Sequence, residues 1–336
     1  MDWRLNVMNF KQLCFLSLLV AAFIIPARAQ AYDPLAVDTN FTPVTADFTV
    51  HDAERERDIP VRVYLPAATQ AAPVVLFSHG LGGTREGSVF LGRHWAARGY
   101  VAVFLQHPGS DDSVWKGKRP GEGMGAMRQA ASLDNFLLRV KDVPAVLDEL
   151  ARWNAEPGHA LMGRMNLKKV GMSGHSFGAV TTEAVSGETL PLSGRKLTDE
   201  RITAAIAFSP SSPTTGSAAR AFGEVQVPWM LMTGTKDVAP IGHADVASRL
   251  AVYDNLRCPA KYELVLDKAE HSVFTDRALP GDREPRNPNH HRVILALSTA
   301  FWDAYLKGDA AALAWLNSQS PRSVMEAADR WRFAGK

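Results

Sequence analysis

Short runs of hydrophobic residues alternate along this chain with longer segments of helical spacing, and this alternation limits the folds open to it. Strands that are apolar on both faces belong to parallel sheets that helices cover on both sides. The clearest runs lie at residues 72–78, 100–105, 202–208 and 227–232, and further strands are expected at 167–172 and 262–266. We therefore predict an α/β fold with a mostly parallel central sheet and helices on both faces.

Helical spacing of hydrophobic residues predicts helices over residues 85–97, 127–153, 176–185, 246–256 and 292–306. Residues 60–66 instead alternate at period two, which predicts an edge or antiparallel strand. Ligands bind at the carboxyl ends of the strands in sheets of this kind. Polar motifs that directly follow the strands therefore mark the expected site.

The first 29 residues have the parts of a secretory signal. Arg4 and Lys11 precede an apolar run at residues 14–25, and small residues flank the expected cleavage site after Ala29. A retained membrane anchor is the alternative, but the run is shorter than the roughly 20 residues that span a bilayer. We therefore expect an exported protein, periplasmic or extracellular, with no stable membrane anchor after cleavage.

Residues 30–336 are expected to form a single domain. Hydrophobic residues make up 46% of the sequence, which suffices for one large core, and no interior stretch has the composition of a linker. Cleavage after Ala29 leaves 34 basic and 34 acidic residues, so no excess charge favours nucleic acid as a partner. Cys258 is then the one remaining cysteine, which excludes an intrachain disulfide.

The pentapeptide from Gly174 to Gly178 has the pattern Gly-x-Ser-x-Gly, with Ser176 at its centre. In this motif the serine lies on a tight turn between a strand and a helix, where side chains at the two glycines would collide. Here the pattern follows an expected strand and precedes an expected helix, as the motif requires. Ser176 is therefore the candidate nucleophile, and an incidental serine in a glycine-rich turn is the alternative.

A serine hydroxyl becomes nucleophilic when a neighbouring base takes its proton, and in the known triads a carboxylate orients that base. In α/β-hydrolases the order along the chain is serine, acid, histidine. His271 directly follows an expected strand and is the candidate base. The alternatives are His243, His290 and His291.

The candidate acid is Asp237, which follows the strand expected at residues 227–232. From that loop its carboxylate can reach the imidazole, where it would determine the tautomer and stabilise the imidazolium. Asp245, Asp267 and Glu270 are the alternatives.

Attack on a carbonyl group creates an oxyanion, which needs preorganised N–H donors. One expected donor is the backbone of Phe177, directly after the candidate nucleophile. The other is expected in the turn at residues 79–83, at the backbone of Leu81. These two N–H groups form the predicted oxyanion hole.

A metal site at His79, His107 and Asp111 is an alternative use of the polar residues near that turn, but their spacing matches no ligand pattern. We therefore expect neither a metal nor a cofactor. Trp115 is a candidate wall of the substrate pocket, with packing over the core as the alternative. It lies in one of three loops that leave from the expected active-site edge, at residues 108–125, 187–197 and 275–289.

Four motifs together resemble a known group of enzymes: HGLGG at residues 79–83, GHSFG at 174–178, TGTKD at 233–237 and EHS at 270–272. They look like the bacterial "predicted dienelactone hydrolase" group, which is similar to platelet-activating-factor acetylhydrolases and, more distantly, to cutinase-like enzymes that degrade polyesters. The resemblance covers nearly all of the mature chain. It implies an α/β-hydrolase fold that acts on carboxylic esters with Ser176, Asp237 and His271 as its triad. Authentic dienelactone hydrolases have a cysteine nucleophile, so the serine here argues against a dienelactone as substrate.

The sequence therefore predicts an exported serine hydrolase that cleaves small-molecule or lipid-like carboxylic esters through an acyl-enzyme. An amide, peptide or thioester hydrolase with the same triad is one alternative. A binding protein on a catalytically inactive hydrolase fold is another. The acyl chain, the alcohol and the oligomeric state are left open.

Overall fold

The computed structural model describes residues 31–119, 121–242, 244–279 and 281–335. The expected signal sequence at residues 1–29 lies outside the described residues, as does His243, one of the alternative bases.

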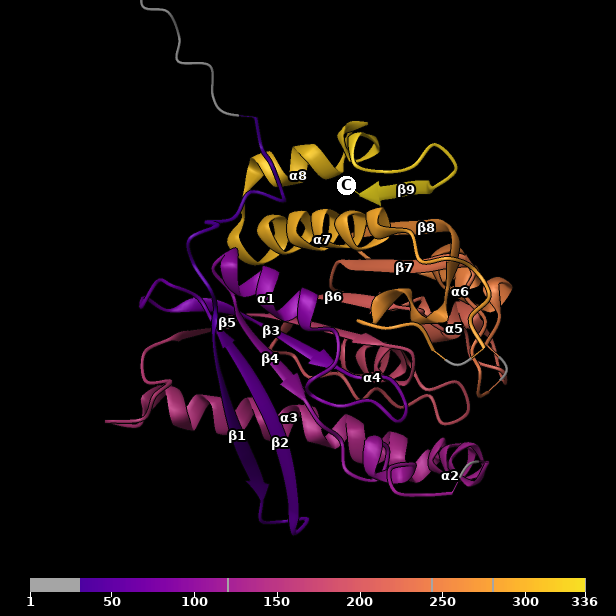
Figure 1. The fold of residues 1–336 in the computed structure, drawn as a ribbon, viewed down its shortest axis with the longest axis horizontal. Coiled ribbons are helices and arrows are strands. Elements are labelled where there is room, and N and C mark those ends of the chain that lie inside the picture. The colour runs from indigo at the N-terminus through magenta and orange to yellow at the C-terminus, as the bar shows by residue number, and fades with distance from the viewer. Residues whose placement is uncertain (1–30, 120, 243, 280, 336) are drawn as a thin grey trace, which may run out of the picture. The chain divides into compact units, whose positions relative to one another are not determined.

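In the described part of the chain, nine strands form one central sheet. They are β1 (Val44–Asp52), β2 (Arg57–Leu65), β3 (Ala72–Ser78), β4 (Val101–Leu105), β5 (Met165–His175), β6 (Ile202–Phe208), β7 (Trp229–Lys236), β8 (Ala260–Glu270) and β9 (Arg330–Gly335). Their order across the sheet is β1-β2-β4-β3-β5-β6-β7-β8-β9 (Figure 1). The six strands from β4 to β8 in this order are parallel, and β2 and β9 are antiparallel to their neighbours. This confirms the predicted α/β class and the mostly parallel sheet.

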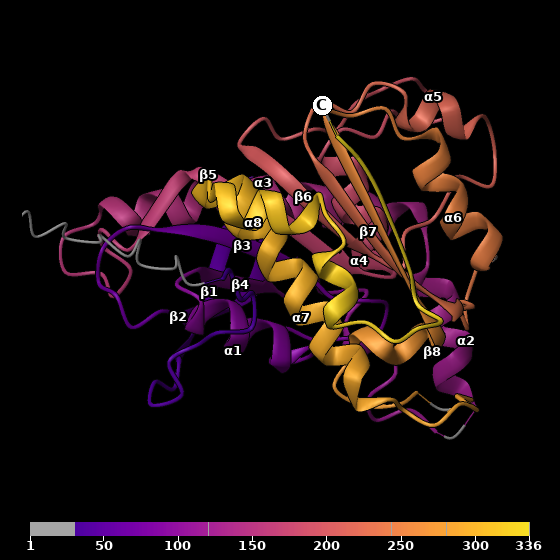
Figure 2. The same cartoon turned by 90° about the horizontal axis from the view of Figure 1, so that it is seen from above.

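Helices cover both faces of the sheet. The longer ones are α1 (Val89–Ala97), α2 (Glu122–Ala130), α3 (Leu133–Ala155), α4 (Phe177–Val185), α6 (Val246–Asn255) and α7 (Pro288–Trp302), with short helices α5 (Ala218–Phe222) and α8 (Ala310–Leu316). Figure 2 shows α7 on one side of β7 and β8 and α6 on the other. None of the described helices is both long and apolar enough to cross a membrane.

Alternate residues of the central strands point to opposite faces, as the period of a strand requires. Val75 and Phe77 of β3 belong to a buried cluster with residues of α1 and α7. Val74 and Leu76 belong to a second cluster with residues of α3. Both faces of β3 are thus buried, which is the reason that its sequence is apolar throughout.

The expected element boundaries are partly right. The strands predicted at residues 72–78 and 202–208 match β3 and β6, and residues 60–66 correspond to β2, which is antiparallel but lies inside the sheet because β1 covers its edge. The single helix expected at 127–153 is instead two helices. Ser132 separates them because its side chain accepts a hydrogen bond from the N–H of Asn135 and so caps α3.

The strands β3 to β8 end at the same edge of the sheet because they are parallel. β5 passes directly into α4 at Ser176, β7 ends next to Asp237, and β8 ends next to His271. The three predicted triad residues therefore meet at this carboxyl edge.

Candidate active site

Ser176 forms the turn between β5 and α4. Its backbone has φ 57° and ψ −115°, a conformation that L-residues rarely adopt. A Cβ atom at Gly178 would lie 1.9 Å from the carbonyl oxygen of Ser78, and one at Gly174 would lie 2.3 Å from that of Gly178. This confirms that side chains at both glycines would collide. The close packing holds the strained turn against the end of β3.

A line of hydrogen bonds joins the three predicted triad residues. The Oγ of Ser176 lies 2.9 Å from Nε2 of His271, the first residue after β8. The Nδ1 of the same imidazole lies 2.7 Å from Oδ1 of Asp237, which follows β7. In the tautomer with its proton on Nδ1, His271 donates to the carboxylate and leaves Nε2 free to accept the serine proton.

The Asp237 carboxylate is fully buried, and protein groups form hydrogen bonds with both of its oxygens. Its Oδ2 accepts hydrogen bonds from Ser209 Oγ at 2.7 Å and Thr233 Oγ1 at 2.8 Å. Burial by itself would raise the pKa of Asp237, but the hydrogen bonds from His271 and Ser209 and the charge of Arg249 outweigh it and hold this pKa at about 2. Asp237 is therefore an anion at neutral pH.

Arg249 of α6 is a part of this site that the sequence did not reveal. Its Nε donates to the backbone carbonyl of Asp237 at 2.8 Å and lies 3.0 Å from Oδ1 of the same residue. Its Nη1 donates to the carbonyl oxygens of Ser209 and Pro210. An arginine in a helix suggests a solvent-exposed position. The available signal was its spacing, because Arg249 lies three and four residues before the buried Val252 and Tyr253.

His175, the variable position before the serine, supports the loop that carries His271. Its Nε2 donates to the carbonyl oxygen of His271 at 2.9 Å, and the two rings lie 4.7 Å apart. Burial and the neighbouring His271 lower the pKa of His175 well below its ordinary value, so its imidazole stays neutral. The sequence alone did not reveal this role of His175.

The two expected oxyanion donors lie in the turns beside Ser176. Phe177 is the first residue of α4, and the helix therefore does not use its N–H. Leu81 lies in the turn after β3, next to Gly80, where a Cβ atom would lie 3.4 Å from Cβ of Ser176. Among the described residues neither N–H donates a hydrogen bond. The role of these groups in binding an oxyanion stays a prediction.

The alternative acids and bases among the described residues are engaged elsewhere. Asp245 caps α6 with its side chain, Asp267 accepts a hydrogen bond from Thr235 Oγ1 at 3.5 Å, and Glu270 accepts hydrogen bonds from the backbone of residues 283 and 284. His290 and His291 lie in the first turn of α7, where the former is buried and the latter stacks on a phenylalanine ring of α1. Neither of these histidines bonds to Ser176, and none of the three acids bonds to the imidazole of His271.

The side chains considered for a metal site also have other partners. His79 accepts a hydrogen bond at Nε2 from the N–H of His107, at 3.0 Å, and its Nδ1 lies 2.7 Å from the carbonyl oxygen of Gly80. Asp111 instead accepts from Gln106 at 2.8 Å. Within the described residues, no group of three or more potential ligands could hold a metal ion.

Trp115 lies over the turn that carries Leu81. Its indole N–H donates to the carbonyl oxygen of Gly82 at 2.8 Å, and a Cβ atom at Gly82 would lie 3.0 Å from the indole ring. The side chain remains 44% exposed, so it is not part of the closed core. Its role as a wall of the substrate pocket stays a prediction.

Comparison of the sequence with models of protein families and with curated proteins found no match. The chemistry of this site is therefore inferred from the geometry of the described residues and from the sequence motifs at residues 79–83, 174–178, 233–237 and 270–272.

Proposed function

We propose that this protein is a serine hydrolase of the α/β-hydrolase fold that cleaves carboxylic esters through an acyl-enzyme. The observation that carries the proposal is the line of hydrogen bonds from Ser176 through His271 to Asp237 at the carboxyl edge of the sheet. The strained turn at Ser176, between a strand and a helix, is a further feature of nucleophiles in this fold. The resemblance to acetylhydrolase-like esterases supports an ester as substrate.

In the first half of the reaction, Ser176 Oγ attacks the ester carbonyl carbon while His271 Nε2 takes the hydroxyl proton. The carbonyl oxygen becomes an oxyanion, to which the N–H groups of Leu81 and Phe177 donate. Collapse of this intermediate breaks the bond to the alcohol oxygen, which receives the proton from Nε2. The acyl group remains on Ser176 as an ester.

In the second half, water attacks the acyl-enzyme carbonyl and gives its proton to His271 Nε2. Collapse then returns that proton to Ser176 Oγ and releases the carboxylic acid. The Asp237 carboxylate remains ionised throughout and stabilises the imidazolium in both halves. If the signal at residues 1–29 is cleaved as we expect, the reaction takes place outside the cytoplasm.

The test is hydrolysis of p-nitrophenyl esters of increasing acyl length by the purified mature chain and by its Ser176→Ala variant. We expect measurable turnover by the parent and a loss of at least about 10³-fold in the variant, because the acyl-enzyme cannot form. Circular dichroism would establish that the variant is folded. A folded Ser176→Ala chain with the parent rate would contradict the proposal.

A matched set of ester, thioester and amide substrates distinguishes an ester hydrolase from a thioester, amide or peptide hydrolase with the same triad. The oxyanion and proton transfers are common to all three, so the ratio of their kcat/KM values reports substrate preference alone. We expect the ester to have the highest kcat/KM. A higher kcat/KM for the amide would reassign the protein to the amide or peptide hydrolases.

A further inference from the structure

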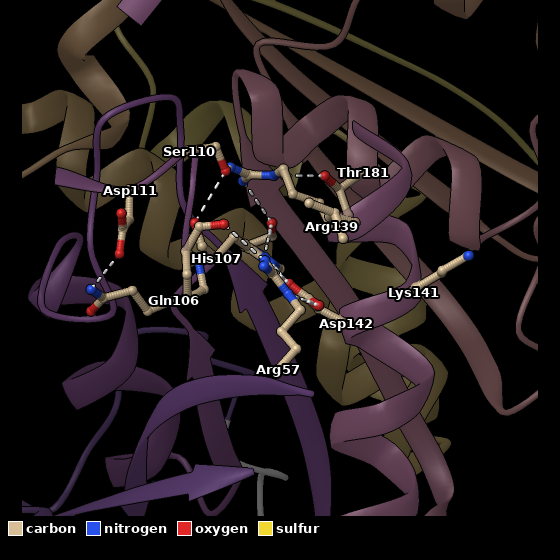
Figure 3. Close-up of polar contacts among 12 residues, drawn as sticks. Arg57, Gln106, His107, Ser110, Asp111, Arg139, Lys141, Asp142 and Thr181 are labelled. Atoms are coloured by element: carbon tan, nitrogen blue, oxygen red, sulfur yellow. Dashed lines mark hydrogen bonds and ion pairs between the residues drawn. The ribbon is translucent and has the colours of Figure 1, made fainter. Parts of the chain in front are cut away.

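A buried polar network lies directly behind the turn at residues 79–83. Arg139 of α3 is at its centre, and Figure 3 shows this side chain between Ser110 and Thr181. Arg139 is fully buried, and within the described residues it forms no direct ion pair with a carboxylate. A charge in this position costs desolvation free energy, which the hydrogen bonds of the guanidinium must offset.

The guanidinium of Arg139 bonds to three separate elements. Its Nε donates to Thr181 Oγ1 on α4 at 3.2 Å, and its Nη1 donates to Ser110 Oγ, in the loop after β4, at 2.9 Å. Its Nη2 donates to Ser78 Oγ at 3.0 Å and to the backbone carbonyl of His79, both at the end of β3. A planar guanidinium can satisfy all these acceptors at once because its donors diverge in one plane.

A second set of hydrogen bonds, through His107 and Asp142, holds the same turn. His107 Nε2 lies 2.9 Å from Ser78 Oγ, and its Nδ1 lies 2.9 Å from Oδ2 of Asp142, against which Arg57 is packed in Figure 3. Burial, followed by the charge of Arg139, lowers the pKa of His107 to about 4 and that of His79 well below its ordinary value. Both imidazoles are therefore neutral, and each keeps one nitrogen that can accept a hydrogen bond.

Arg139 contacts His79, two residues before Leu81, and the side chain of Phe177. Leu81 and Phe177 carry the two expected oxyanion donors. Leu81 lies between His79, whose carbonyl Arg139 binds, and Gly82, whose N–H donates to the carbonyl oxygen of Ser110. Phe177 has its ring 4.6 Å from the Arg139 guanidinium carbon. Its carbonyl oxygen accepts a hydrogen bond from Thr181, another partner of that guanidinium. One side chain therefore links the two halves of the predicted oxyanion hole.

We propose that Arg139 is a positioning residue that holds the N–H groups of Leu81 and Phe177 in the relative geometry an oxyanion requires. This inference depends on the proposed ester hydrolysis. Arg139 acts through other residues, so its substitution is expected to lower kcat and leave KM nearly unchanged, since the oxyanion exists only after attack. Lysine should not replace it, because a single ammonium cannot bridge acceptors on three elements.

The experiment compares Arg139→Met and Arg139→Lys with the parent on p-nitrophenyl acetate and on its thiono analogue, in which sulfur replaces the carbonyl oxygen. Sulfur is a poor hydrogen-bond acceptor, so a well-formed oxyanion hole favours the oxygen ester. We expect kcat for the oxygen ester to fall about 100-fold in both variants, with KM changed by less than about threefold. The ratio of oxygen-ester to thiono-ester kcat/KM is expected to fall about tenfold.

The control is Arg332→Met, which removes the ion pair between the exposed Arg332 of β9 and the buried Glu263 of β8. It should lower the melting temperature without changing the oxygen-to-thiono ratio. If the Arg139 variants fail to fold, Ser110→Ala and Thr181→Val each remove a single bond to the guanidinium. We expect these milder changes to lower kcat by about three- to tenfold, with a parallel fall in the ratio.

Two results would overturn the inference and are distinguishable. Folded variants of Arg139, Ser110 or Thr181 with the parent's kcat and ratio would refute the positioning role alone, provided that Ser176→Ala is inactive. An active Ser176→Ala variant would instead refute the proposed function, and the positioning role with it.

Discussion

Among the described residues, two arrays of hydrogen bonds run from a serine through a histidine to an aspartate. The outer array consists of Ser176, His271 and Asp237, and the inner array of Ser78, His107 and Asp142. The distance from serine Oγ to Nε2 is 2.9 Å in both, and the distances from Nδ1 to the carboxylate are 2.7 Å and 2.9 Å. Bond lengths therefore do not distinguish a candidate triad from a structural network.

The surroundings of the two serines do distinguish them. Ser78 is a fully buried strand residue, and its Oγ also accepts a hydrogen bond from Arg139. Ser176 is partly exposed on a strained turn, with the N–H of Phe177 directly after it. A nucleophile needs access to substrate and N–H donors for the oxyanion as well as a base. Only the outer array has these features.

His107 is unsuited to proton transfer for an electrostatic reason. His107 is fully buried and close to Arg139, and these two effects lower its pKa to about 4. A proton taken by this imidazole would lie near an existing positive charge in a medium of low polarity. The inner array is therefore suited to hold the turn at residues 79–83 and not to transfer protons at neutral pH.

Replacement of the histidines gives the largest expected difference between the arrays. His271→Ala should lower kcat for p-nitrophenyl acetate by about 10⁴-fold or more, because the proposed base is lost. His107→Ala should instead lower the free energy of unfolding by about 2–4 kcal/mol, since it leaves a cavity and unpaired buried partners. Ester hydrolysis and urea unfolding measure the two effects. Similar losses of kcat in both folded variants would contradict the assignment of a catalytic role to the outer array and a structural role to the inner array.

The aspartates provide the second comparison. Asp237→Asn should leave the chain folded and lower kcat by about 10⁴-fold, because the imidazolium loses its counter-ion and the tautomer changes. Asp142→Asn should lower the free energy of unfolding by about 3–5 kcal/mol, since Arg57 would lose its carboxylate partner and Arg55 would keep Asp52 alone. Paired kinetic and urea-unfolding measurements on each variant check this. An Asp142→Asn chain as stable as the parent would show that the inner array has no structural role.

Acid pH should weaken the inner array in a defined range. Burial by itself would raise the pKa of Asp142, but hydrogen bonds from His107 and Arg57 and their charges lower it from 3.8 to about 2. The unfolded chain then binds the proton first, so the contribution of Asp142 is complete above about pH 4 and is lost as the pH falls to about 2. Protonation of Asp142 lowers the free energy of unfolding by about 2 kcal/mol. Urea unfolding between pH 2 and 7 should therefore show a steeper acid decline for the parent than for Asp142→Asn.

The smallest expected effect concerns Oδ2 of Asp237, the carboxylate oxygen that does not bond to His271. Thr233→Val removes one of the two hydroxyl groups that donate to Oδ2 of Asp237 and leaves Ser209 in place. We expect kcat to fall about three- to tenfold, in line with the loss of about 1 kcal/mol for one hydrogen bond. The control is Thr203→Val, whose hydroxyl bonds to a backbone carbonyl at the opposite end of the sheet. An equal kinetic loss in the control would attribute the effect to general destabilisation.

Local patterns predicted the strands that are buried on both faces, because such strands must be apolar at nearly every position. Residues 72–78 and 202–208 match β3 and β6 for this reason. β1 and β9 were not predicted. Neither contains a continuous apolar run, since each lies at an edge of the sheet with much of its surface exposed.

The sequence by itself determined the candidate triad, because each member directly follows an expected strand and the strands of a parallel sheet end at one edge. It did not reveal Arg249 or Arg139, because an arginine within a helix is normally expected on the solvent-exposed face and helical spacing alone does not identify its partners. Their partners lie on other elements, up to 61 residues away from Arg139 in the case of Ser78. Only the tertiary structure brings a guanidinium and its dispersed acceptors together, so only the structure separates the inner array from the outer one.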